Sequence, residues 1–111
     1  MAQLPLNTFK TRALELTTAE QTVYTTPTGL TTIVLGAQAS NLTANPVKIT
    51  FTLRKNNEDF IMLKDFTIPP NDAVEVTTGK LVIEQGSSVK AVVTANTSVN
   101  LILSILETSN E

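Results

Sequence analysis

The chain has 111 residues and a formal net charge of −2, and charged residues make up only 16% of it. This length suits one domain that buries roughly two-thirds of its unfolded surface. Cys, His and Trp are absent, which excludes disulfides, thiolate chemistry, the Ser-His-Asp triad and ordinary zinc sites. No run of Lys or Arg is present, so the sequence argues against a nucleic-acid partner, whose phosphates need clustered cations.

Threonine makes the surface polar in place of charge, with nineteen copies along the chain. Because Thr is β-branched and prefers extended backbone, this composition favours sheets with hydroxylated outer faces. No apolar run reaches the length of a membrane span, and the N-terminus lacks the pattern of a signal peptide. We therefore expect a soluble protein with no membrane partner that is not exported by the standard route.

The first residues predict an arm that precedes the folded domain. Residues 1–7 include Gln3-Leu4-Pro5-Leu6, a short apolar segment that must dock on its own domain or on a neighbour. Residues 8–111 are expected to form a single domain. Within residues 9–17 a helix is possible over residues 12–16, but the flanking threonines and the shortness of the segment favour a strand.

The next segments read as strands separated by turns. Residues 21–25 predict a short strand that ends in the turn sequence Thr26-Pro27-Thr28-Gly29. Residues 31–39 are apolar on both faces around residues 33–35, as in a central strand covered on two sides. Gly36 inside this strand predicts a bulge or a close approach of another backbone.

Residues 47–54 show the clearest alternation, with Val47, Ile49, Phe51 and Leu53 on one face and polar residues on the other. Only a strand separates the two sets completely. The charged residues 55–59 predict an exposed tip, and residues 60–63 return from it. Of the aromatic residues, Phe51 and Phe66 are expected in the core, and Tyr24 and Phe60 in the core or an interface.

Residues 68–107 contain four short apolar runs cut by turn sequences, which predict consecutive β-hairpins. The last run places Val99, Leu101, Leu103 and Ile105 on one face, as in a strand packed on a core. Its other face is only half polar, because Ile102 and Leu106 lie on it, and needs cover from another layer or subunit. In total, eight or nine strands at near-regular spacing predict a single all-β antiparallel β-sandwich, jelly-roll or immunoglobulin-like in connectivity.

No constellation for catalysis, cofactor binding or metal binding emerges. A glycosidase needs two carboxyl groups across a cleft, whereas Glu58-Asp59 lies at a predicted loop tip. Asn71-Asp72 follows two prolines and predicts a turn rather than a calcium site. Glu75 and Glu84 alternate with apolar neighbours and are expected to face outward. The triplets at Asn41 and Asn96 fit the glycosylation pattern, but a Thr-rich chain produces such triplets by chance.

Several stretches carry a resemblance to a known group of proteins. They are Leu4-Pro5-Leu6-Asn7, residues 22–35 with Val23-Tyr24-Thr25, Pro27 and Gly29, Leu63-Lys64-Asp65-Phe66 with Ile68-Pro69, Gly79-Lys80-Leu81-Val82 with Glu84 and Gly86, and Leu103-Ser104-Ile105-Leu106-Glu107. In these the chain resembles small virion structural proteins of tailed bacteriophages, of the marine cyanophage type. The motifs are strand and turn features without a catalytic signature, so the resemblance supplies no active-site residues.

The resemblance implies a non-enzymatic component of the virion, made in the host cytoplasm. The first interpretation is a capsid decoration (cement) protein that forms a homo-oligomer and contacts the major capsid protein or other virion proteins. The second is a neck, tail or fibre component, and a third is a host-glycan-binding module that uses an exposed aromatic such as Tyr24. The interface is expected at Leu4, Pro5, Leu6, Ile102 and Leu106, with no cofactor.

Overall fold

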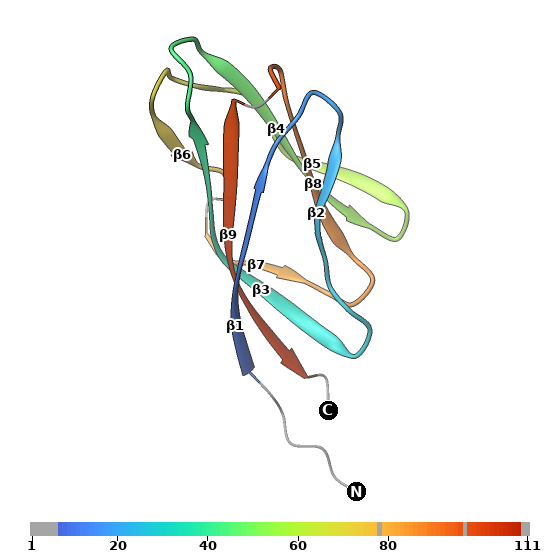
Figure 1. The fold of residues 1–111 in the computed structure, drawn as a ribbon. Helices are drawn as coiled ribbons and strands as arrows, with labels where there is room; N and C mark the ends of the chain where they lie inside the picture. The colour runs from blue at the N-terminus through green and yellow to red at the C-terminus, as the bar shows by residue number, and fades with distance from the viewer. Residues whose placement is uncertain (1–6, 78, 97, 110–111) are drawn as a thin grey trace, which may run out of the picture.

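A computed structural model describes residues 7–77, 79–96 and 98–109. These residues form nine β-strands and no helix (Figure 1). The strands are β1 (Asn7–Glu15), β2 (Gln21–Thr25), β3 (Leu30–Asn41), β4 (Val47–Lys55), β5 (Glu58–Ile68), β6 (Ala73–Glu75), β7 (Leu81–Ile83), β8 (Ser88–Val93) and β9 (Val99–Ser109). Residues 9–15 therefore form a strand rather than a helix, as their threonines predicted.

The strands form two antiparallel sheets. The five-stranded sheet has the order β1-β9-β3-β6, with β7 also paired to β3, and the four-stranded sheet has the order β2-β8-β4-β5. The first strand pairs with the last, and β2 pairs with the next to last, which is the nesting of a jelly roll. In an immunoglobulin-like sandwich the first strand pairs instead with the second. The predicted β-sandwich is confirmed, and the jelly roll is the correct one of its two connectivities.

The core lies between the two sheets and is filled by the residues that alternation selected. Val99, Leu101, Leu103 and Ile105 of β9 are all buried, and so are the side chains of Ile49 and Phe51 on β4. Burial of each large side chain contributes roughly 1.5–3 kcal/mol. The outermost predicted member, Leu53, is only partly buried because it lies near the β4–β5 turn.

Strand β3 is central in its sheet, with β9 on one side and β6 and β7 on the other. The two short strands pair with successive parts of β3, so they act as one interrupted edge. The predicted bulge is confirmed, because the register with β9 shifts between Val34 and Gly36. A side chain at Gly36 would also meet Glu75 Oε2 at 3.1 Å.

Two predictions of burial made from the sequence were wrong. Strand β3 was expected to be covered on both faces, yet Leu35 on its outer side is 39% exposed. Phe66 was expected in the core and is 42% exposed. Both errors have one physical cause: alternation identifies an apolar side chain, but only the opposing layer decides whether that side chain is covered.

The β4–β5 hairpin turns at Asn56 and Asn57, whose φ angles are 54° and 63°. Two successive positive φ angles are typical of the two-residue turn that matches strand twist, and Asn tolerates them. The tip predicted for residues 55–59 is therefore shorter than expected, because Lys55 ends β4 and Glu58 and Asp59 begin β5. Gly29, with φ of 87°, completes the predicted turn after Pro27, where Leu30 N donates to Pro27 O at 3.2 Å.

Candidate interaction surfaces

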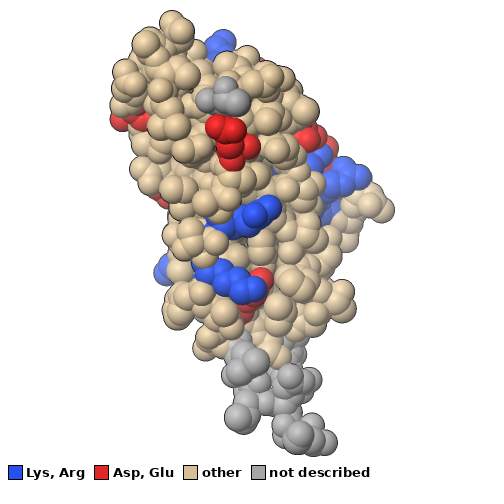
Figure 2. All heavy atoms as spheres, viewed as in Figure 1, with Lys and Arg blue, Asp and Glu red and all other residues tan. Residues whose placement is uncertain are grey.

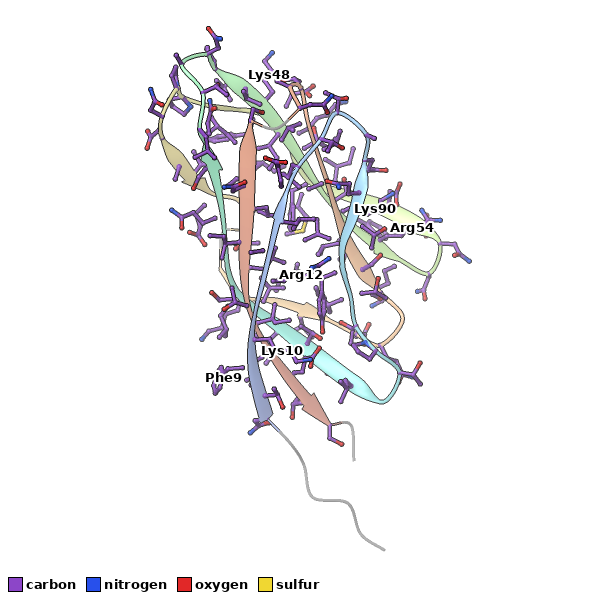
Figure 3. The ribbon with its side chains drawn as sticks, viewed as in Figure 1. Phe9, Lys10, Arg12, Lys48, Arg54 and Lys90 are labelled. Atoms are coloured by element: carbon purple, nitrogen blue, oxygen red, sulfur yellow. The ribbon has the colours of Figure 1, made fainter. Side chains whose placement is uncertain are left out.

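An apolar row crosses the outer face of the five-stranded sheet. The register pairs Phe9 of β1 with Leu106 of β9, Leu106 with Ile33 of β3, and Ile33 with Val82 of β7. Directly paired residues project from the same face of a sheet, so these four side chains form one continuous line, the cross-sheet row. Phe9 is 73% exposed and Val82 56% exposed. Figure 3 shows Phe9 pointing away from the body of the domain, opposite to Lys10.

Both predicted interface residues of β9 lie on this outer face. Leu106 is a member of the row and is only partly exposed, whereas Ile102 lies four residues earlier on β9, opposite Ala13 and Gln38, and is 40% exposed. That the two residues form an interface stays a prediction. Phe9, Ile33 and Val82 were missed in the sequence, because their alignment depends on pairing between distant strands.

The other predicted interface residues are Leu4, Pro5 and Leu6. They lie outside the described residues, so the arm remains a prediction. The described chain begins at Asn7, which is directly opposite Thr108 at one end of the five-stranded sheet.

A second exposed apolar region lies on β5, the outermost strand of the four-stranded sheet. Phe60 is 50% exposed, Ile61 55% and Met62 38%, and they are consecutive. Phe60 pairs with Leu53 and Ile61 with Thr52, so these two neighbours project from opposite faces of the edge strand. Phe66 is also exposed on this strand.

Polar side chains join the two sheets where β1 faces β2. Tyr24 of β2 donates its hydroxyl proton to Glu107 Oε2, and Thr32 Oγ1 lies 2.9 Å from that hydroxyl. Lys10 Nζ lies 2.9 Å from Glu107 Oε1. Arg12 Nε donates to the carbonyl of Val23 at 2.9 Å, and Figure 3 shows both cations directed from β1 toward the four-stranded sheet.

The environment of this link shifts two ionisations. Burial, reinforced by the neighbouring carboxylate of Glu107, raises the pKa of Tyr24 to about 12. The hydrogen bond from Tyr24, with the cation of Lys10, lowers the pKa of Glu107 against the opposing effect of burial. Both shifts favour the neutral phenol and the carboxylate. Tyr24 is half-buried and its hydroxyl is used inside the protein, so it is not the exposed platform that the glycan-binding alternative invoked.

The outer face of the four-stranded sheet carries ion pairs. Lys90 Nζ lies 3.0 Å from Glu20 Oε1 and 3.0 Å from Asp59 Oδ2, and Arg54 Nη1 lies 2.8 Å from Asp59 Oδ1. Arg54 and then Lys90 lower the pKa of Asp59. Glu20 and then Asp59 raise the pKa of Lys90. Elsewhere the surface is mostly uncharged, as Figure 2 shows for one side of the molecule.

The carboxylates have structural roles, although Glu58 and Asp59 lie at the start of β5 rather than at the predicted loop tip. Asp59 is held in ion pairs at the hairpin, and Asp72 Oδ1 accepts from the Ala73 amide at 2.8 Å in a turn. Glu75 and Glu84 are exposed: Glu75 Oε2 accepts from Ala37 N at 3.0 Å, and Glu84 pairs with Lys55. None of these contacts sets two carboxyl groups across a cleft.

Asn41 has a structural role in a corner of the fold. Its buried Nδ2 donates to the carbonyls of Asn45, Ile68 and Pro69 at 2.7, 3.0 and 3.2 Å. This amide is therefore not available for a glycan in the folded chain. An open hollow of about 410 Å³ lies beside it, lined by Ser40, Asn41, Leu42, Asn71, Asp72 and Ala73.

Within the ranges that the structure covers, no group of three or more His, Cys, Asp or Glu residues could hold a metal ion. The same ranges contain no helix that is long and apolar enough to cross a membrane.

No protein-family model matches the chain, and no curated protein matches it either. Its fold is nevertheless similar to solved structures. One is a chain of the disulfide-linked pili that form Bacillus endospore appendages, 8% identical with a TM-score of 0.59, where the match covers 96% of this chain and 89% of that one.

Two viral particles contain similar chains. The acid-stable capsid of Helicobacter pylori bacteriophage KHP30 has one with 11% identity and a TM-score of 0.55, covering 97% of this chain and 94% of that one. The virus-like particle of the extra small virus of the prawn Macrobrachium rosenbergii has another, with 10% identity, a TM-score of 0.53 and coverage of 100% and 83%. At these identities the likeness shows a shared fold.

Proposed function

We propose that this protein is a structural component of a bacteriophage virion, a decoration protein that binds the capsid shell as a homo-oligomer. It is made in the host cytoplasm and incorporated into the particle, and it acts through protein contacts rather than catalysis. Its partners are further copies of itself and the major capsid protein or another virion protein. Many such contacts together stabilise a shell by mass action.

The observation that carries this proposal is the cross-sheet row. Four large apolar side chains cross this outer face, and in a solitary domain Phe9 and Val82 at the two ends are exposed while Leu106 and Ile33 between them are partly exposed. Adjacent strands lie about 4.8 Å apart, so the row is roughly 14 Å long. Leu35 is 39% exposed on the same face and widens the row. Exposed apolar side chains that gather on one face are typical of a protein interface.

The fold comparisons give independent support. The similar chain in the bacteriophage KHP30 capsid is matched over 94% of its own length, so it too is a small domain of this kind. A jelly roll also closes its core without disulfides, which suits a cysteine-free chain that must remain folded outside the cell.

The experiment that tests the proposal introduces charge at both ends of the row. Phe9→Asp with Val82→Asp places two carboxylates where the row must be desolvated. We expect self-association to weaken at least about 100-fold, because two contacts worth roughly 1.5–3 kcal/mol each are lost. Sedimentation of the purified protein measures the association, and mass spectrometry of particles measures incorporation, which should fall in parallel.

The matched control is Thr22→Asp with Thr25→Asp, which adds the same charge at exposed positions of β2 on the other sheet. This control should associate and enter particles like the parent chain. A monomeric parent chain that is absent from purified particles would contradict the proposal.

A second candidate is a neck, tail or fibre component of the same virion. The similarity to a pilus chain favours it, since pili are filaments. The number of copies per particle distinguishes the two, because a decoration protein is present in hundreds and a neck or tail component in a few to a few dozen. Reconstruction of the particle by electron microscopy provides this number directly.

A further inference from the structure

We propose that the free edge of β5 binds residues 4–6 of a second copy of this chain by strand addition. The inference rests on the proposed function, because it requires a chain that self-assembles. It gives the predicted arm a binding site that is separate from the cross-sheet row.

The first step is that β5 has the properties of a strand-accepting edge. Among the outermost strands in the described ranges, β5 is the longest, with eleven residues, and it pairs only with β4. Its regular register runs from Glu58 to Ile61. Beyond that segment the edge is interrupted, because the register shifts and Asp65 has a φ of 48°. A free edge with exposed apolar side chains recruits an extended partner.

The second step is that a three-residue apolar segment fits this short edge. Phe60 lies opposite Leu53, which lines the core side, while Ile61 lies opposite Thr52 and faces the other side. Both faces of the edge therefore offer an exposed apolar side chain. In an extended segment, Leu4 and Leu6 project to one face and Pro5 to the other, so each face of β5 gains an apolar neighbour.

Pro5 determines which backbone edge of the added segment faces β5. Proline lacks an N–H and is accepted in a strand only where that position faces away from the partner. In an extended chain the N–H groups of Leu4 and Leu6 then point toward β5, where they donate to its free carbonyls. The proline that prevents the segment from joining the interior of a sheet is thus compatible with an added edge strand.

The third step excludes the arm of the same copy. Strand β1 lies beside β2, as the bond from Arg12 to Val23 shows, and three strand spacings separate β2 from β5. That distance is roughly 14 Å. Residues 4–6 are within about 10 Å of Asn7 even when fully extended. They cannot lie along their own β5, so the segment that fits it belongs to another copy.

The experiment exploits the absence of Cys in this chain. Gln3→Cys in one sample and Glu58→Cys in another are mixed at assembly and treated with a short bis-maleimide. These positions leave every proposed anchor intact. We expect a covalent heterodimer at least about ten-fold above the yield with Thr22→Cys as the acceptor, because contacts within an oligomer act at high effective concentration. Adding Leu4→Ser and Leu6→Ser to the donor, or Ile61→Ser to the acceptor, should return the yield to the control level.

Three results would overturn this inference. One is a yield equal to that of the Thr22→Cys control, and another is a yield that the serine substitutions leave unchanged. The third is that Gln3→Cys in particles cross-links only to a different virion protein, which would assign the arm to the particle instead. If association still depends on Phe9 and Val82 in any of these cases, the proposed function stands and only the β5 assignment fails.

Discussion

The two outer faces of this sandwich differ most clearly along one matched row of four residues. In the five-stranded sheet the row consists of Phe9, Leu106, Ile33 and Val82. In the four-stranded sheet the corresponding row consists of Thr22, Lys90, Thr52 and Ile61. Both rows cross four strands in register, yet only the second has charge and hydroxyl groups at its centre.

This difference shows which outer face covers its strands with its own side chains in a single copy of the chain. Lys90 is only 13% exposed because Glu20 and Asp59 hold its ammonium group across the sheet. The lysine stem covers the strands while its charge remains near water. The two ends of the apolar row have no equivalent cover, because Phe9 is 73% and Val82 56% exposed.

The largest expected effect separates inner from outer positions of β9. Leu103→Ala, at a fully buried position, should lower the free energy of unfolding by about 2–5 kcal/mol because it leaves a cavity. Ile102→Ala, on the next residue but the outer face, should cost about 0.5 kcal/mol in a dilute monomer. Urea unfolding at low protein concentration measures both.

A large cost for Ile102→Ala under dilute conditions would contradict the assignment of its face as uncovered. If the cost grows with protein concentration, Ile102 also contributes to association, because the measured stability then includes the free energy of association that the substitution removes.

The next effect concerns the link that holds the two sheets together at β1 and β2. Tyr24→Phe removes the donor to Glu107, and the loss of a hydrogen bond to a buried carboxylate should cost about 1–3 kcal/mol. The substitution also tests a pH dependence. Since the pKa of Tyr24 is raised from 10.0 to about 12 on folding, its stabilising contribution is complete below pH 10 and is lost as the pH rises toward 12.

The measurement is simple because Tyr24 is the only tyrosine. The absorbance of tyrosinate should report an ionisation well above that of a free phenol, and the stability of Tyr24→Phe should fall less than that of the parent chain between pH 10 and 12. An ordinary phenol titration in the folded chain would contradict the link.

Acid should act on the other member of this link. The pKa of Glu107 is lowered on folding, so its contribution is present above its ordinary value of 4.5 and is lost as the pH falls through the folded value. Glu107→Gln should therefore flatten the stability profile below about pH 4.5. Thermal unfolding from pH 3 to 7 tests this, with Glu15→Gln on exposed β1 as the control.

The sequence predicted the strands well and the surfaces only in part. Alternation located the buried side of β9 and β4 because each strand carries that information within a few residues. The cross-sheet row joins residues of four strands whose register is set by the whole fold. Tyr24 and Glu107 are likewise far apart in the chain and meet only across the two sheets. Pairing between distant strands, rather than the property of any one strand, determines both.

The exposure of apolar residues on β5 could not be predicted from the sequence either. Phe66 has the character of a core residue, yet it lies on an edge strand and is 42% exposed. Nothing in residues 58–68 themselves shows that β5 lies at the edge of its sheet. An apolar residue in an edge strand therefore has two readings in sequence, core or interface, and only the opposing layer decides between them.

The smallest expected effect is that of Lys90→Ala, which removes two ion pairs from the outer face of the four-stranded sheet. Such surface pairs contribute little to stability and are screened by salt, so 1 M salt should erase most of the difference between this variant and the parent chain. Association through the apolar row should persist in the same salt, because burial of apolar surface does not depend on unscreened charge. If 1 M salt separated the oligomer into monomers, the contact would be ionic. The charged face of the four-stranded sheet would then be the interface, and the apolar row would need another partner.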